Sequence, residues 1–494
     1  MKLPCISNAA QYITRFIICT LFGVLLIGIS PPALADELED VLSGFDEQPA
    51  ETSMAKDDNA LESVLSGFDE PAGDAPASGL KTKQRFIPEW LEISGELRLT
   101  ATVNTAHHAP EPDKRKNTDY RGLSMLRTAA NITGDMTFSG VKARIGGRSF
   151  YDAAYTLNDR SQYTQQLLDD YETESELTEV WLQADLRDNL DIKTGRQIAV
   201  WGRSDNIRVT DILNPLNNRQ PGMTDIKDLR LPVAMTELDY YTGDWNLSGI
   251  VIHEPRFAEN PVYGSDFYPG DSPPPPQDTP SVSLENQQYA LALNGIFSGW
   301  DLSFYSAYVF DSRSHIETDA SGTKHARHGR VFMAGMAGNI ASGNWMFKGE
   351  AAWWNNLEFA NQASQEKSRI DALAAAEYTG FSETVIAFEA ANRHLIDYDD
   401  ALSRPPDNQE EDLFQSVLRV TRDFRNDTVQ LKIILSTFGL DCQDGALQRL
   451  QLDYDCTDNL TLTGGAVFYQ SGDLYVFQNI GDNDRVFLEM SYAF

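Results

Sequence analysis

The sequence has few cysteines and few basic side chains. Its 494 residues include 4 Cys, and 40 Lys or Arg stand against 73 Asp or Glu, for a formal net charge of -33. Nucleic-acid-binding proteins need excess positive charge to neutralise phosphates, so this balance argues against nucleic acid as a partner. An acidic surface is suited instead to contact with divalent cations or to solubility.

Only two cysteines are expected in the mature chain. Cys5 and Cys19 lie in an N-terminal segment that we expect to be removed, which leaves Cys442 and Cys456 in an oxidising compartment. The stretch GALQRLQLDY between them is typical of a strand, and an extended strand would hold the two sulfurs too far apart for a disulfide. We therefore expect two free thiols.

Residues typical of catalytic and cofactor sites are also sparse. The chain has 7 His, and none lies in a recognisable catalytic context with a nucleophile and a third orienting group. His325 and His328 in KHARHG could bind a metal only if a loop supplied further ligands, so an incidental pair is the favoured interpretation. With no glycine-rich phosphate loop and no Cys-x-x-Cys, we expect no enzymatic activity, no catalytic residue, no cofactor and no metal.

Long hydrophobic runs are missing after residue 35, where no stretch reaches 18 consecutive apolar residues. This excludes helical membrane spans but not a membrane β-barrel, whose strands need an apolar residue only at every second position. Residues 1 to 35 combine Lys2 and Arg15 with an apolar run from Phe16 to Ile29 and end in PPALAD. They predict a signal peptide cleaved after Ala35.

Residues 36 to 89 form an acidic arm with a repeated element, LEDVLSGFDE at 38 to 47 and LESVLSGFDE at 61 to 70. The apolar residues of each copy share one face of a short helix, which is too short to be stable alone in water. Either the arm is a disordered solvated tether, or the repeats are docking peptides for a periplasmic partner. The candidate docking residues are Leu38, Val41, Leu42, Phe45, Leu61, Val64, Leu65 and Phe68.

From residue 90 to the C-terminus, short alternating segments recur, and tight turns alternate with long connections between them. Such alternation is typical of an up-and-down membrane barrel with short periplasmic turns and long outer loops. We predict an all-β, transmembrane antiparallel β-barrel of about 18 strands over residues 90 to 494, preceded by the disordered arm. The tight turns are centred near residues 139, 188, 243, 298, 342, 381, 426 and 458.

Aromatic residues support this prediction. Trp245, Trp300 and Trp345 each follow a tight turn, as expected for an aromatic girdle at one membrane interface. The chain ends in DNDRVFLEMSYAF, where alternation places Met490, Tyr492 and Phe494 on the lipid side and Glu489 in the lumen. Tyr492 and Phe494 are the expected signal by which the barrel-assembly machinery selects the chain.

One region also carries a family resemblance. GRQIAVWGRSDNIRVTDILNPLNN, followed by DLRLPVAMTELDYYTGDW, resembles a large uncharacterised family, of a domain of unknown function, of proteobacterial outer-membrane β-barrels. The matching residues are Gly195, Arg196, Gln197, Trp201, Gly202, Arg203, Asp205, Asn214, Pro215, Arg230, Pro232, Gly243, Asp244 and Trp245. The resemblance implies transport of hydrophobic or lipid-like cargo beside RND-type exporters and a periplasmic lipoprotein-sorting-like protein.

Residues 198 to 231 are the longest charged connection, with charges of nearly alternating sign. A barrel of this width leaves an aqueous channel, which a long inward-folded loop could narrow. Alternatively, the loop caps the barrel outside through weak surface ion pairs. The candidate constriction residues are Arg196, Arg203, Asp205, Arg208, Asp211, Arg219 and Arg230.

We therefore expect an outer-membrane channel or transport component of a Gram-negative bacterium, with the N-terminal arm in the periplasm. Its expected partners are outer-membrane lipid, the assembly machinery and a periplasmic protein or RND-type exporter. The alternative is a closed structural or adhesive barrel whose acidic loops bind ligands. Bilayer conductance separates the two, because a plugged barrel is electrically silent.

Overall fold

A computed structural model describes residues 88–110, 118–363 and 365–494 of the chain. The chain divides into two units, Met1–Pro71 and Ala72–Phe494, and every described residue belongs to the second. The expected signal peptide, the eight candidate docking residues and all of the arm except Pro88 and Glu89 lie outside the described residues.

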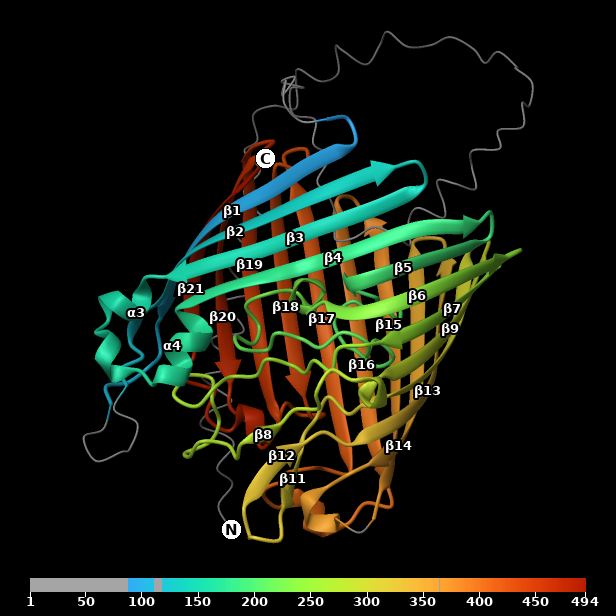
Figure 1. Ribbon diagram of the computed structural model, residues 1–494. Coiled ribbons are helices and arrows are strands. Elements are labelled where there is room, and N and C mark those ends of the chain that lie inside the picture. The colour runs from blue at the N-terminus through green and yellow to red at the C-terminus, as the bar shows by residue number, and fades with distance from the viewer. Residues whose placement is uncertain (1–87, 111–117, 364) are drawn as a thin grey trace. The chain divides into compact units, whose positions relative to one another are not determined.

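Eighteen strands form one closed antiparallel sheet, drawn in Figure 1. Each strand pairs with its neighbours along the chain, and β1 pairs with β21 from Glu96 opposite Ala493 to Asn104 opposite Arg485, which closes the barrel. The expected 18-stranded barrel is thus confirmed. The strands are β1 (Leu91–Asn104), β2 (Gly122–Phe138), β3 (Val141–Asp152), β4 (Thr173–Arg187), β5 (Leu190–Gln197), β6 (Val233–Thr242), β7 (Trp245–Ile252), β9 (Gln288–Phe297), β10 (Trp300–Phe310), β13 (Arg330–Ser342), β14 (Trp345–Leu357), β15 (Lys367–Phe381), β16 (Thr384–Ile396), β17 (Asp412–Phe424), β18 (Val429–Phe438), β19 (Gly445–Thr457), β20 (Leu460–Gln470) and β21 (Arg485–Ala493).

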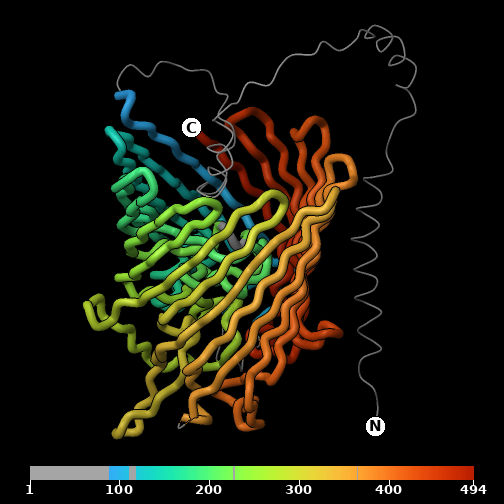
Figure 2. Tube along the Cα trace, turned by 90° about the vertical axis from the view of Figure 1, so that its right-hand side faces the viewer, coloured from blue at the N-terminus to red at the C-terminus, as the bar shows by residue number. Residues whose placement is uncertain are grey.

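All eight expected tight turns join consecutive strands at one end of the barrel, where Figure 2 also places the C-terminus. The long connections lie at the other end and contain short elements that the sequence patterns did not predict. These are α3 (Ala154–Leu157), α4 (Gln165–Tyr171), α5 (Ile226–Leu229), a small sheet of β8 (Gln277–Asp278), β11 (His315–Thr318) and β12 (Lys324–Arg327), and the 3-10 helices η1 (Arg160–Gln162), η2 (Leu284–Asn286), η3 (Ala360–Gln362), η4 (Asp400–Ser403) and η5 (Tyr475–Phe477). No helix in the described part of the chain is long and apolar enough to cross a membrane.

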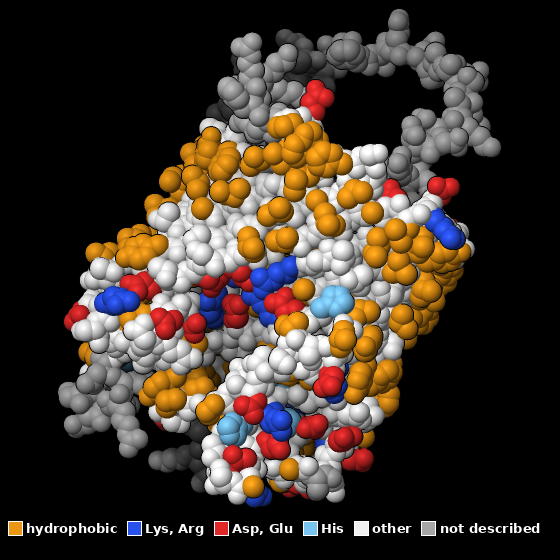
Figure 3. Space-filling model, in the orientation of Figure 1, with side chains coloured by type: hydrophobic (Ala, Val, Ile, Leu, Met, Phe, Trp, Pro, Cys, Tyr) orange, Lys and Arg blue, Asp and Glu red, His pale blue; other side chains and the backbone are white. Residues whose placement is uncertain are grey.

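The two faces of the sheet differ as the alternation predicts. On β10, Phe304 points outward and is 42% exposed, whereas the adjacent Ser303 is fully buried inside. Trp245, Trp300 and Trp345 begin β7, β10 and β14 directly after tight turns, which confirms their expected common height. In Figure 3, hydrophobic side chains spread over the strands and charged ones gather over the long connections.

The barrel interior contains an apolar core, whereas the strand number alone indicated an aqueous channel. Ile207, Val209 and Leu213 from the connection between β5 and β6 are buried against inward side chains such as Met235 and Met333. This difference arises because the connection carries apolar residues between its charges, and those residues remove one another and the wall from water.

The C-terminal residue extends the pairing of β21 with β1 that closes the barrel. Phe494 and Gly95 exchange two backbone hydrogen bonds of 2.9 Å, and the Phe494 ring lies over Gly95, where a Cβ would meet its Cζ at 2.5 Å. The outward orientation of Met490, Tyr492 and Phe494 is confirmed by their exposure. Cys442 and Cys456 are free thiols, as expected, and lie near opposite ends of β19.

Candidate functional site

The connection between β5 and β6, residues 198–232, folds into the barrel. Trp201, Ile207, Val209 and Leu213 lie in the main apolar cluster together with inward residues of the wall. The Trp201 ring stacks on Tyr305 of β10, with ring centroids 4.7 Å apart. In Figure 1 this segment is the green trace between the front strands and the rear wall. Its apolar side chains therefore anchor it against the inside of the barrel.

Glu350 of β14 binds the first part of this inward loop. Its carboxylate accepts hydrogen bonds from the backbone N–H groups of Arg203 (2.6 Å), Ser204 (2.8 Å) and Thr210 (3.1 Å), and from the Thr210 hydroxyl (2.7 Å). Gly202 has φ +86° at this point, and a Cβ there would lie 2.8 Å from Glu350 Oε1. Glycine therefore permits both the left-handed turn and the close approach of the carboxylate.

Glu389 of β16 binds the next turn of the loop in the same way. Its carboxylate accepts from the backbone N–H groups of Asp205 (2.9 Å), Asn206 (3.1 Å) and Ile207 (2.9 Å) and from the Asn206 side chain (3.0 Å). Glu389 is only 1% exposed. Hydrogen bonds of this kind to a charged acceptor are roughly twice as strong as neutral ones, so two wall carboxylates fix the loop backbone.

Asn214 ties the ends of the loop together. Its side-chain oxygen accepts from the Ala199 N–H at 2.8 Å, and its amide group donates to the carbonyl of Leu231 at 2.9 Å and of Gln197 at 3.2 Å. The side chain is fully buried. One asparagine thus joins the end of β5, the loop and the segment just before β6.

Further along, Asp225 reaches the opposite wall. Its carboxylate lies 3.2 Å from Lys432 of β18, 3.2 Å from Arg449 of β19 and 3.9 Å from Arg419 of β17. Burial raises the pKa of Asp225, but the three positive charges outweigh it and hold the pKa below its ordinary value. In the closed ring, β17 to β19 lie across from β5 and β6, so the loop spans the lumen.

The structure divides the seven candidate constriction residues among several contacts. Arg208 and Arg230 share the carboxylate of Asp211, at 3.0 and 2.9 Å. Asp205 pairs with Lys348 of β14 at 2.6 Å, and the Arg203 guanidinium donates to Ser303.

Arg196 and Arg219 belong instead to one network of ion pairs on the wall of β3 to β5. Arg196 pairs with Glu176 at 3.0 Å, and Arg219 pairs with Glu174 at 2.6 Å. Arg148 of β3 contacts both of these glutamates and so joins the two pairs. The seven residues thus make separate contacts within the loop and with two parts of the wall, and they do not form one cluster.

The comparisons with known proteins identify the family. The model of the family described as "Protein of unknown function (DUF1302)" matches residues 19–494. The chain belongs to this DUF1302 family. No curated protein gives a significant sequence match.

Solved structures share the architecture of this DUF1302 protein. A BenF-like porin from Pseudomonas fluorescens Pf-5 is 12% identical, with 82% of this chain and 98% of that chain covered and a TM-score of 0.50. OccAB1 from Acinetobacter baumannii is 11% identical, with 82% and 97% covered and a TM-score of 0.47. OpdK from Pseudomonas aeruginosa, solved with vanillate, is 10% identical, with 82% and 98% covered and a TM-score of 0.47. At these identities, the likeness to the BenF-like porin shows the fold, an outer-membrane-type β-barrel.

Several residues that hold the loop in this DUF1302 protein were not among the sequence candidates. They are Glu350, Glu389, Asp225, Lys432 and Arg449. Glu350 and Glu389 are single carboxylates at inward positions of small-residue strands, in KGEAAW and AFEAAN. An inward carboxylate beside alanines was the available signal, because such a side chain requires a partner inside the barrel.

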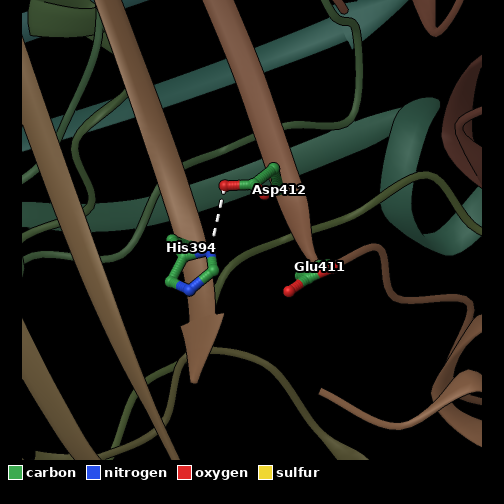
Figure 4. Close-up of side chains that lie close together, drawn as sticks. All are labelled: His394, Glu411 and Asp412. Atoms are coloured by element: carbon green, nitrogen blue, oxygen red, sulfur yellow. Dashed lines mark hydrogen bonds and ion pairs between the residues drawn. The ribbon is translucent and has the colours of Figure 1, made fainter. Parts of the chain in front are cut away.

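A His and two carboxylates lie together at the long-loop end of β16 and β17. The ligand atoms of His394, Glu411 and Asp412 are within 4.8 Å of one another. Figure 4 draws the three side chains and the contact between His394 and Asp412. His394 Nδ1 lies 3.0 Å from Asp412 Oδ1, which also accepts from the Asn392 side chain at 2.7 Å. The hydrogen bond between His394 and Asp412 holds these two side chains together. Of the pair considered from sequence, His328 stacks on Phe257 and contacts the Gln277 side chain, whereas His325 contacts Asp278 and Asp319.

Proposed function

We propose that this DUF1302 protein is an outer-membrane channel in which residues 198–232 form the constriction. The observation that supports the proposal is the path of this loop from β5, across the lumen, to the ion pairs of Asp225 with the opposite wall. A channel loop must hold its position against solvent, and the backbone bonds to Glu350 and Glu389 supply that rigidity.

The charges along this path favour selection by charge. One side of the lumen carries the linked arginines and glutamates of β3 to β5, and the other carries Lys432, Arg449 and Arg419 around the single carboxylate of Asp225. Opposed charged walls at a constriction orient and filter charged solutes. In this proposal the long connections face outward, and both termini and the arm are periplasmic.

Bilayer recording tests the channel. Purified protein in planar lipid bilayers should conduct ions, and Glu389→Gln should raise the conductance or cause frequent current steps, because the loop backbone loses a charged acceptor worth about 2 kcal/mol. Asp188→Asn is the matched control, since it removes one acidic charge from an exposed tight turn and should leave the current unchanged. Folded protein that passes no current would refute the channel.

A closed barrel is the second candidate, and the apolar cluster around Trp201 favours it, since this cluster fills part of the lumen. In that case the outer loops, rather than the interior, would carry the function through ligand binding. The same recording separates the two candidates, because a closed barrel stays silent even when wild-type protein is fully folded.

The proposed cargo is hydrophobic or lipid-like, moved together with a periplasmic and inner-membrane export system. Support comes from the family resemblance and from the two LSGFD elements, whose apolar faces suit docking to a periplasmic protein. Tyr492 and Phe494 are the proposed contact with the assembly machinery, and a transport role involves no catalytic residue. Membrane lipid and the assembly machinery are the remaining partners.

Deletion of residues 36 to 80 tests the arm. We expect the barrel to insert normally, the periplasmic partner to be lost from pull-downs and the cargo to accumulate on one side of the envelope. A comparison of outer-membrane lipids with and without the protein identifies the cargo. Unchanged pull-downs and unchanged lipids would remove the docking proposal.

A further inference from the structure

A cavity of about 360 Å³ lies at the long-loop end of the barrel interior. Its walls include the inward loop around residues 208–218 and the long-loop ends of β14, β15 and β16. The starts of the connections after β7 and β10 complete the lining. Small-molecule sites in proteins occupy roughly 300 to 1,000 Å³, so the cavity has room for one small organic molecule.

Positive charge exceeds negative charge around the cavity. Its lining includes the five arginines 208, 256, 313, 369 and 393 and the four carboxylates 211, 254, 311 and 371. The carboxylates are already bound to neighbouring groups. Asp371, for example, accepts from Arg369 at 2.6 and 2.8 Å and from the Trp354 indole at 2.9 Å.

Arg393 is the arginine left with neutral acceptors. It lies opposite Asp371 in the register of β15 and β16, yet its guanidinium donates to the Gln415 side chain at 3.3 Å and to the Arg208 carbonyl at 3.2 Å. Among the described residues, none brings a carboxylate within the 4.0 Å ion-pair distance of Arg393. Asp371 attracts Arg393 electrostatically, but that carboxylate is hydrogen-bonded to Arg369 and to the Trp354 indole. A half-buried guanidinium without a direct ion pair is unfavourable, and a planar carboxylate matches its donor geometry.

The rest of the lining is apolar. Leu357, Val309 and Ile252 are nearly fully buried and border the same cavity as Arg393, together with Trp354. An inorganic ion would leave these surfaces without a contact. A ligand that matches both Arg393 and the apolar lining carries an anionic head and an apolar body.

We propose that this cavity binds an amphipathic organic anion, a carboxylate with an apolar body, whose carboxylate pairs with Arg393. The inference rests on the proposed channel and names its substrate class. The bound anion places its apolar body against β10 and β14 and lies beside the inward loop.

Calorimetry with the full-length protein in lipid nanodiscs tests the proposal, with empty nanodiscs subtracted. The probe is 4-phenylbutyrate, and the comparison ligands are 4-phenylbutanol, which lacks the charge, and acetate, which lacks the apolar body. We expect 4-phenylbutyrate to bind at least tenfold more tightly than either. Equal affinity for the alcohol would overturn the role of the arginine, and equal affinity for acetate would overturn the role of the apolar walls.

Variants locate the site. Arg393→Gln should weaken 4-phenylbutyrate binding at least tenfold, whereas Arg422→Gln should change it less than twofold. Arg422→Gln is the matched control, because this substitution removes one arginine charge from the part of β17 near the tight turns. Arg422 does not line the cavity. Unchanged binding by Arg393→Gln would overturn the site. Should that variant fail to fold, Arg393→Lys, which keeps the charge but loses the planar fork, should bind with intermediate affinity.

Conductance recorded on the same samples separates this inference from the proposed function. Binding of 4-phenylbutyrate with no current would refute the channel and keep the cavity as the ligand site of a closed barrel. Current without binding would keep the channel and overturn the ligand class.

Discussion

Gly202 illustrates how single residues set the inward loop. Its positive φ turns the chain so that the N–H groups of Arg203 and Ser204 point at Glu350, and its missing Cβ leaves space for that carboxylate. The Trp-Gly-Arg segment was recognised from sequence as part of a family pattern. Its physical role depends on Glu350, which lies 148 positions away in the chain, and no local pattern names that partner.

Asp225 gives the loop a defined response to pH. Its folded-state pKa lies below the ordinary 3.8 because Lys432, Arg449 and Arg419 outweigh the effect of burial. A lowered pKa in the folded state means that the stabilisation is present above the unfolded value and is lost as pH falls through the folded value. Docking of the loop should therefore persist from neutral pH to below 3.8.

The expected result is a channel conductance that is constant from neutral pH to about 4 and changes only in stronger acid. Asp225→Asn should weaken loop docking by about 3 kcal/mol and shift the conductance at neutral pH already, because three cations lose their shared counter-charge. Single-channel recording against pH measures both effects, with Asp188→Asn as control. If the Asp225→Asn variant shows the same change of conductance in acid as the wild type, another carboxylate is responsible for that change.

At the scale of elements, β21 depends on a glycine in its neighbour. The Phe494 ring occupies the space over Gly95 of β1, and the two residues share backbone hydrogen bonds at the seam of the barrel. A methyl group at position 95 would also lie 2.9 Å from the Asn131 carbonyl oxygen. The Phe494 ring therefore packs against β1 only because residue 95 has no side chain.

Gly95→Ala should destabilise the closed barrel by about 1 to 3 kcal/mol through this overlap. The measurement is the urea midpoint of unfolding, read from the heat-modifiable mobility of the folded barrel on gels. Gly134→Ala on β2 is the matched control, because a Cβ there has its nearest neighbour at 3.8 Å. Equal midpoints for the two variants would contradict a specific fit of Phe494.

Tight turns and strand faces were predictable from sequence, whereas the short elements of the long connections were not. Period-two alternation and turn residues are local, so Ser303 and Phe304 could be sorted to opposite faces of β10. In contrast, α4 is held by Leu167, Leu168 and Tyr171 against Tyr155 and Val262, which come from other segments. A helix of this length forms because tertiary contacts stabilise it, and its own sequence gives little signal.

At the scale of the whole molecule, the barrel is closed but its interior is divided. The inward loop, its apolar cluster and the ion pairs of Asp225 cross the lumen, and the cavity beside Arg393 lies at the long-loop end. In the proposed channel, passage through the barrel therefore depends on how firmly Glu350 and Glu389 hold the loop. The proposed selectivity is a property of opposite walls that only the closed sheet brings to face each other.

The membrane-type β-barrel, its strand number, its tight turns and the orientation of its last strand could be predicted from the amino-acid sequence, because each of these follows from contacts between neighbours in the chain. Which charged groups meet depends instead on the three-dimensional fold. Three such contacts are Asp225 with Lys432, Glu389 with the Ile207 amide, and Arg393 with the Arg208 carbonyl. They are consequences of ring closure, which brings distant strands and one long loop into a single interior. No spacing along the chain encodes such meetings, since they depend on the curvature of all eighteen strands together.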